Sequence, residues 1–137
     1  MGLILDTSTL VKGERRGQSV PQILEHIITV CGETEIGVSA VTIVELAHGI
    51  QRATSEMQRQ RRLVFVQDLS ASIRVHALTG TIAELAGFIS GQEAGRGIVL
   101  PFADLLIGAT ALHLGYDVVT ENVRHFEMIP GLTVKQL

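Results

Sequence analysis

The sequence has a single cysteine and no long run of apolar residues. Cys31 has no partner within the chain, which excludes an internal disulfide and fits a reducing compartment. The longest apolar segment, residues 105–114, is interrupted by Gly108, Thr110 and His113, and it is shorter than the ~20 residues that cross a bilayer. We therefore expect a cytoplasmic protein without a membrane span.

Positive charge is also scarce. Eleven Lys and Arg residues stand against fourteen Asp and Glu residues, for a net charge of −3, so no overall positive field attracts the chain to nucleic acid. Any such contact would have to come from local arginines. Apolar residues make up 46% of the 137 residues. We therefore expect a single domain over residues 1–137, with part of its apolar surface covered by a partner or a second copy.

Short apolar segments alternate with segments of helical periodicity. Strands are predicted at residues 3–5, 35–38, 73–78, 117–120 and 132–134, and helices after Ser19, after Ser39, at about 55–67, after Thr79 or Thr81, and at 102–114. This alternation predicts a three-layer α/β/α domain with a mostly parallel central sheet. In such sheets the functional site lies beyond the carboxyl ends of the strands.

Three acidic residues lie in apolar surroundings near this expected rim. Asp6 follows the first strand, while Glu45 and Asp104 lie near the starts of two helices. An isolated carboxylate beside a buried segment is costly unless it is paired, and hard divalent cations prefer carboxylate oxygens. The three acids therefore predict a shared metal site, of the kind that positions water and stabilises the leaving oxygen in phosphodiester cleavage.

Each acid also has a purely structural interpretation. Asp6 could cap the turn that follows it, Glu45 could lie on a solvated helix face, and Asp104 could complement the dipole of its helix. The metal site is absent only if all three of these interpretations hold.

Other polar residues are expected at the same rim. Asn122 follows the strand at 117–120 and is either a turn residue or a further ligand through its side-chain carbonyl. The hydroxyl groups of Thr7, Ser8 and Thr120 could orient carboxylates or waters, or they could cap helices.

The segments around these residues resemble the four motifs of the PIN-domain family. The matching segments are Leu3-Ile4-Leu5-Asp6-Thr7-Ser8, Glu45-Leu46-Ala47-His48-Gly49, Asp104-Leu105-Leu106-Ile107-Gly108-Ala109 and Thr120-Glu121-Asn122-Val123-Arg124-His125-Phe126. The resemblance covers nearly the whole chain and is nearest to the VapC-type toxins of prokaryotic toxin–antitoxin modules. It implies a PIN-like fold and an endoribonuclease that depends on Mg²⁺ or Mn²⁺. In such an enzyme a metal-activated water cleaves RNA, and a VapB-type antitoxin keeps the enzyme silent.

The resemblance also implies roles for single residues. It assigns metal binding to Asp6, Glu45 and Asp104, and it places Asn122 at a fourth catalytic position where many relatives carry Asp. Contact with DNA would come only through the antitoxin. The candidates for RNA binding are the four arginines that we expect in loops, namely Arg15, Arg16, Arg96 and Arg124.

Gly87, Gly91 and Gly95 recur every four residues in one predicted helix. Each glycine costs ~1 kcal/mol relative to alanine in a helix interior, and close approach of another helix would explain all three. We therefore expect a homodimer with this helix in or beside the interface. A frayed helix end is the alternative explanation for Gly95.

Two other functions compete with the metal-dependent nuclease. A strand-end Asp6 also suits the nucleophile of a phosphoaspartyl phosphatase, but dehalogenase-type phosphatases need a second Asp where this chain has Ser8. The only lysines, Lys12 and Lys135, do not follow a central strand. The second alternative is a catalytically weak binding module within a DNA-binding toxin–antitoxin complex. Metal-dependent cleavage of RNA by the free protein would distinguish these functions.

Overall fold

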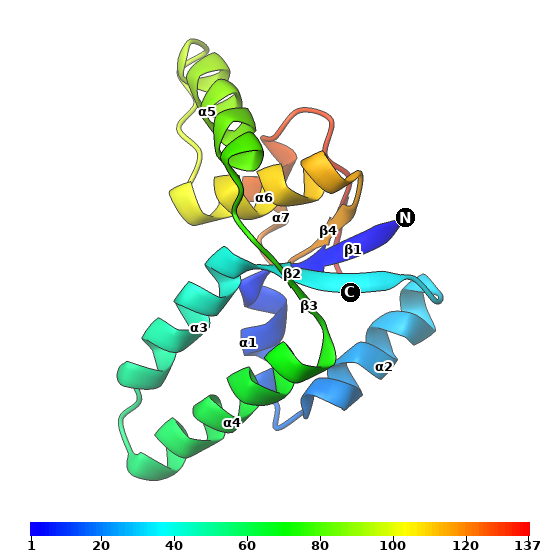
Figure 1. The fold of residues 1–137 in the computed structure, drawn as a ribbon, viewed down its shortest axis with the longest axis vertical. Helices are drawn as coiled ribbons and strands as arrows, with labels where there is room; N and C mark the ends of the chain where they lie inside the picture. Colours follow the sequence, from blue (N-terminus) through cyan, green and yellow to red (C-terminus); the bar gives the residue numbers. More distant parts are fainter.

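Five parallel strands form the centre of the computed structural model, which describes residues 1–137 (Figure 1). The strands are β1 (Gly2–Leu5), β2 (Glu35–Ser39), β3 (Arg74–His76), β4 (Asp117–Val119) and β5 (Val134–Lys135). Their order in the sheet is β3-β2-β1-β4-β5, and all neighbouring pairs are parallel. The expected parallel sheet is thus confirmed, although β3 is shorter than the predicted segment 73–78.

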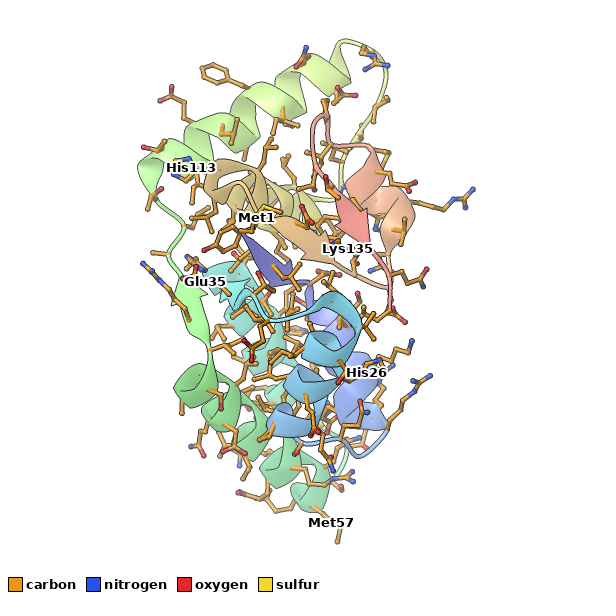
Figure 2. All side chains as sticks on the ribbon, turned by 90° about the vertical axis from the view of Figure 1, so that its right-hand side faces the viewer. Met1, His26, Glu35, Met57, His113 and Lys135 are labelled. Atoms are coloured by element: carbon orange, nitrogen blue, oxygen red, sulfur yellow. The ribbon has the colours of Figure 1, made fainter.

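Helices cover both faces of this sheet. They are α1 (Thr7–Arg15), α2 (Val20–Cys31), α3 (Ala40–Gln51), α4 (Glu56–Ser72), α5 (Gly80–Ala94), α6 (Phe102–Leu114) and α7 (Val123–Glu127). Figure 1 shows α1, α2 and α4 on one side of the sheet and α5, α6 and α7 on the other. Figure 2 shows Met57, near the start of α4, at the opposite end of the molecule from α5. The three-layer prediction is confirmed, and no helix is both long and apolar enough to cross a membrane.

The apolar residues of β1 divide between two cores because successive side chains of a strand point to opposite faces. Leu3 and Leu5 pack in a buried cluster with residues of α1, α2 and α4, including Leu69. Ile4 packs in a second cluster with residues of α5 and α6, including Ile107. Burial on both faces explains why β1 is a continuous apolar segment rather than an alternating one.

Polar side chains start the helices where the sequence predicts. Ser19 accepts a hydrogen bond from the Gln22 N–H, and the Gln22 side chain accepts one from the Ser19 N–H. Such a reciprocal pair satisfies two N–H groups that the helix leaves free. Ser39 and Thr79 cap α3 and α5 with single bonds. Gly115 ends α6 in the left-handed conformation, with φ of 70°, which favours glycine.

Two helices are absent from the sequence-based prediction. Only Leu10 and Gly13 are buried in α1, so this helix lacks the apolar stripe that reveals a helix in a sequence. The other, α7, has only five residues. A third difference concerns Gly95, which lies just beyond the end of α5 rather than within it.

The order in which strands are added to the sheet reverses at β1. From β1 the sheet continues through β2 to β3 on one side and through β4 to β5 on the other. A crevice forms at such a switch point beyond the carboxyl ends of the two central strands. Here those ends lead directly into Asp6 and Thr120.

Candidate metal-binding and catalytic site

Asp6 lies at the switch point and is 2% exposed. Its backbone is extended, and its N–H donates to the carbonyl of Val119 at 2.9 Å, which continues the pairing of β1 with β4. Its carboxylate makes no capping bond to α1. Instead, Oδ2 accepts hydrogen bonds from the hydroxyls of Ser8 at 2.6 Å and Thr120 at 2.8 Å. The two hydroxyls thus hold Asp6 from both sides of the switch point.

Glu45 lies in the second turn of α3 rather than at the helix start. The hydroxyl of Thr7, the first residue of α1, donates to Glu45 Oε1 at 2.6 Å and lies 3.2 Å from the hydroxyl of Thr42. Burial is the main reason why the pKa of Glu45 is raised, and the charges of Asp6 and Asp104 raise it further, while the Thr7 bond lowers it. Ionisation of Glu45 is therefore opposed both by its burial and by the charges of its acidic neighbours.

Asp104 lies in the first turn of α6, with a side chain that is 14% exposed. Its Oδ2 lies 2.7 Å from Nδ1 of His125 on α7. Burial raises the pKa of Asp104 most, and the charge of Asp6 adds to this rise, whereas the bond from His125 opposes it.

The three carboxylates therefore repel one another across one rim, yet each has its own fixed partner. In every case one oxygen accepts the hydrogen bond from a hydroxyl or an imidazole, and the other oxygen accepts no hydrogen bond from the chain. No group of three Asp, Glu, His or Cys side chains lies close enough to share an ion in this conformation. The structure thus places the three predicted acids near one another without assembling them into a closed cluster.

Asn122 is exposed at the start of α7, and its side chain makes no capping hydrogen bond. Its backbone N–H donates to the hydroxyl of Thr120 at 2.9 Å, and its carbonyl accepts from the His125 N–H at 3.1 Å. Asn122 thus contributes only its backbone atoms to the turn, and its amide side chain makes no hydrogen bond that would hold the turn.

The four arginines do not form one surface. Arg15 lines a cavity of about 120 Å³ together with Glu45, and Arg16 lines another with Glu121. Arg96 pairs with the buried Glu93 at 3.4 Å, just beyond the end of α5 that lies farthest from the sheet in Figure 1. The expectation that Arg15 and Arg124 lie in loops is wrong, because they belong to α1 and α7.

Sequence reasoning missed several polar contacts at the rim. Thr42 supports Thr7, His125 holds Asp104, and Lys12 forms an ion pair with Glu121. The only sequence signals are spacings: Thr42 precedes Glu45 by one helical turn, and Lys12 follows Ser8 by one turn. The second spacing has meaning only once α1 is known to be a helix.

Known proteins are similar to this chain in sequence and in fold. The PIN domain family matches residues 3–131. Ribonuclease VapC1 of Rickettsia felis is 32% identical over 136 residues, which cover 98% of this chain and 95% of the relative. The tRNA(fMet)-specific endonuclease VapC of Salmonella typhimurium is 29% identical over 98 residues, or 72% of each chain.

Solved structures agree on the fold. The structure of DNA-bound VapBC from Salmonella typhimurium contains a chain that superposes with a TM-score of 0.83 at 24% identity, over 99% of this chain and 98% of that one. The resemblance noted in the four sequence motifs is therefore confirmed, and the chain belongs to the PIN-domain family, among the VapC ribonucleases.

Proposed function

We propose that this protein is the endoribonuclease toxin of a toxin–antitoxin pair and that it hydrolyses RNA with a divalent cation held at the β1–β4 switch point. The observation that carries the proposal is the anchoring of Asp6, Glu45 and Asp104, each by one oxygen only. The relatives named as ribonucleases support the choice of substrate class.

The donor set fits Mg²⁺ or Mn²⁺ in its chemistry, although the three acids do not form a closed cluster. Mg²⁺ is usually held by one or two carboxylates and keeps several waters, so it needs no such cluster. Hard oxygen ligands suit both ions, and ligating carboxylates in metalloenzymes are themselves hydrogen-bonded by neighbouring groups. Asp6, Glu45 and Asp104 have such neighbours in Ser8, Thr120, Thr7 and His125. When bound, the cation would supply positive charge beside the scissile phosphate and lower the pKa of a water molecule. It would also offset the burial and the mutual repulsion that together raise the pKa values of Glu45 and Asp104.

Other residues of the chain would orient the carboxylates and bind the RNA. Thr7, Ser8 and Thr120 fix the carboxylates, and the free amide of Asn122 offers a carbonyl oxygen to the cation or a donor to a phosphate oxygen. Arg15, which lines a cavity with Glu45, is the best-placed arginine for the RNA backbone. Arg16 and Arg124 extend this contact, whereas Arg96 is engaged with Glu93.

The test is cleavage of tRNA and rRNA panels by the free protein with Mg²⁺, with Mn²⁺ and with a chelator. We expect cleavage that requires a divalent cation and is lost in Asp6→Asn and Asp104→Asn. Asp68→Asn is the matched control because Asp68 is an exposed acid on α4. Cation-independent cleavage, or full activity in a folded Asp6→Asn protein, would contradict the proposal.

We further propose a VapB-type antitoxin as the partner, with DNA contacted only through it. The 120 Å³ cavity beside Glu45 has an apolar lining from α1, α3 and α4, formed by Val11, Leu46, Phe65 and Val66. A neighbouring groove shares Glu14 and Phe65 and continues along α4 to Val64. An apolar segment of the antitoxin that lies here would also cover the site. Val66→Glu should abolish inhibition by the antitoxin, whereas Val30→Glu, at an exposed position on α2, should not.

A second copy of the chain is proposed for the α5 surface. A Cβ atom added at Gly87 or Gly91 would meet no atom within 4 Å apart from the neighbouring backbone of α5 itself. Both glycines line a groove with Phe102, which is 75% exposed, and Phe88 beside them is 68% exposed. Nothing within the chain uses these glycines, so close packing of a second α5 accounts for them.

A further inference from the structure

The turn that follows β4 is fastened to α1 by several separate contacts. The Glu121 N–H donates to Ser8 Oγ at 3.0 Å. Ser8 Oγ also lies 3.2 Å from Thr120 Oγ1, but this approach is not a hydrogen bond when both hydroxyls donate to Asp6. One helical turn later, Lys12 Nζ forms an ion pair with the Glu121 carboxylate. Residues four apart lie on one face of a helix, so Ser8 and Lys12 contact the same three-residue segment, Thr120 to Asn122.

This segment is directly connected to the site. The Thr120 hydroxyl donates to Asp6, and it also accepts the hydrogen bond from the Asn122 N–H that positions Asn122. Since the Ser8 and Thr120 hydroxyls each donate their single proton to Asp6, neither has a proton left to bind the other. Among the contacts between α1 and the turn, only the Lys12–Glu121 pair is ionic.

The Lys12–Glu121 pair is partly sheltered, with side chains 36% and 21% exposed. Without Lys12, the charge of Glu121 would add to the three carboxylates at the rim, and the turn would be pushed away from Asp6. A like charge beside a group of carboxylates is unfavourable, so the ammonium has both an electrostatic and a geometric effect.

We propose that Lys12 is a positioning residue for the site: by holding Glu121 it keeps Thr120 on Asp6 and Asn122 at the start of α7. This inference rests on the proposed function, because it assigns Lys12 a role in metal binding and RNA cleavage. In this role Lys12 contacts neither the cation nor the RNA.

Direct contact of Lys12 with an RNA phosphate is the competing role. Lys12 lines a cavity of about 170 Å³ between α1 and α2 together with Arg16 and His26, and Figure 2 labels His26 on α2. Glu121 also lines this cavity. Its carboxylate already pairs with the Lys12 ammonium, so the positioning role is favoured.

The experiment compares Lys12→Met, Glu121→Gln, the double variant and the charge exchange Lys12→Glu with Glu121→Lys. Lys135→Met is the matched control, since Lys135 pairs with Asp117 at 3.3 Å at the beginning of β4. The measurements are Mn²⁺ affinity by calorimetry, and kcat and KM on a short RNA, after thermal melting has confirmed the fold.

A positioning role predicts that both single variants lose about 10- to 100-fold in Mn²⁺ affinity or kcat, the usual effect of removing a group that orients a metal ligand. KM should change little, the double variant should be no worse than either single one, and the charge exchange should recover most of the loss. Lys135→Met should behave as the wild type.

Three outcomes would overturn the inference. Unchanged Mn²⁺ affinity and kcat in Lys12→Met would show that the pair does not support the site. A raised KM in Lys12→Met, with a lowered KM in Glu121→Gln, would instead assign Lys12 to the RNA. Failure of the charge exchange to recover Mn²⁺ affinity would also count against it. If the wild type cleaved no RNA at all, the proposed function would fail, and Mn²⁺ affinity would still test the pair.

Discussion

Nδ1 of His125 lies 2.7 Å from Oδ2 of Asp104, which joins α7 to the first turn of α6. The histidine belongs to the same short helix whose first residue follows Asn122. The bond from His125 opposes the rise in the Asp104 pKa that burial causes. His125 therefore favours the ionised form of Asp104 and fixes the orientation of its carboxylate.

Replacing this histidine should make the site more sensitive to acid. In His125→Ala the pKa of Asp104 should rise further, because the hydrogen bond that lowers it is lost. Mn²⁺ affinity should then fall more steeply than in the wild type as the pH is lowered from neutral, since a protonated carboxyl is a poor ligand. Calorimetry at several pH values measures this, and parallel pH profiles for the two proteins would contradict it.

A cation that binds only the folded protein should raise its melting temperature. The expected gain is ~2.7 kcal/mol at a hundredfold excess over Kd. Mg²⁺ or Mn²⁺ should therefore stabilise the wild type and have much less effect on Asp6→Asn, measured by thermal melting with and without cation. Equal responses of the two proteins would place the cation elsewhere.

Without a cation, Glu45 should destabilise the folded protein at neutral pH. Its pKa in the folded state is raised above the ordinary value of 4.5, so the folded protein binds the proton more tightly than the unfolded chain does. The stability associated with Glu45 is complete below 4.5 and is lost as the pH rises through the folded-state pKa.

Glu45→Gln keeps the shape and an oxygen that can accept the Thr7 bond. Relative to the wild type, this variant should gain stability as the pH rises from below 4.5 to neutral. Urea denaturation in the presence of a chelator measures the difference. A stability difference that stays constant with pH would mean that the Glu45 pKa is not raised.

How far the sequence predicted the site depended on the separation of the contacting residues. Asp6 was located because it directly follows a buried strand, and the capped helices were located because Ser19, Ser39 and Thr79 precede apolar periodic segments. Because β1 and β4 are parallel neighbours, the residues that follow them, Asp6 and Thr120, lie at the same rim of the sheet.

The hydroxyls of Thr7, Ser8 and Thr120 were expected at the rim, but the acid that each one binds was not predictable in the same way. Thr7 and Glu45 are 38 residues apart, and Lys12 and Glu121 are 109 apart. Such pairs depend on how α1 lies against α3 and β4, and α1 itself has too few buried residues to show an apolar stripe. Which hydroxyl orients which acid was therefore harder to predict than which residues are expected at the rim.

The fourth position of the site offers a gain-of-affinity test. Asn122 presents an amide without a capping bond, and Asn122→Asp would add an anionic oxygen ligand, which Mg²⁺ and Mn²⁺ prefer. Mn²⁺ affinity should increase, as measured by calorimetry, with the wild type and Asp104→Asn as references. Unchanged or weaker affinity would mean that Asn122 serves only the turn.

The α5 surface should hold a second copy of the chain. Gly91 has room for a side chain within its own chain, so Gly91→Leu should leave the fold intact and even gain helix propensity, since glycine is the poorer helix former. A leucine there would, however, keep a second α5 at a distance. We expect a wild-type dimer and a largely monomeric variant in light scattering at micromolar concentration. Glu84→Leu on the same helix is a control for added apolar surface. A monomeric wild type would contradict the dimer, and a Gly91→Leu dimer of unchanged affinity would place the interface on another face.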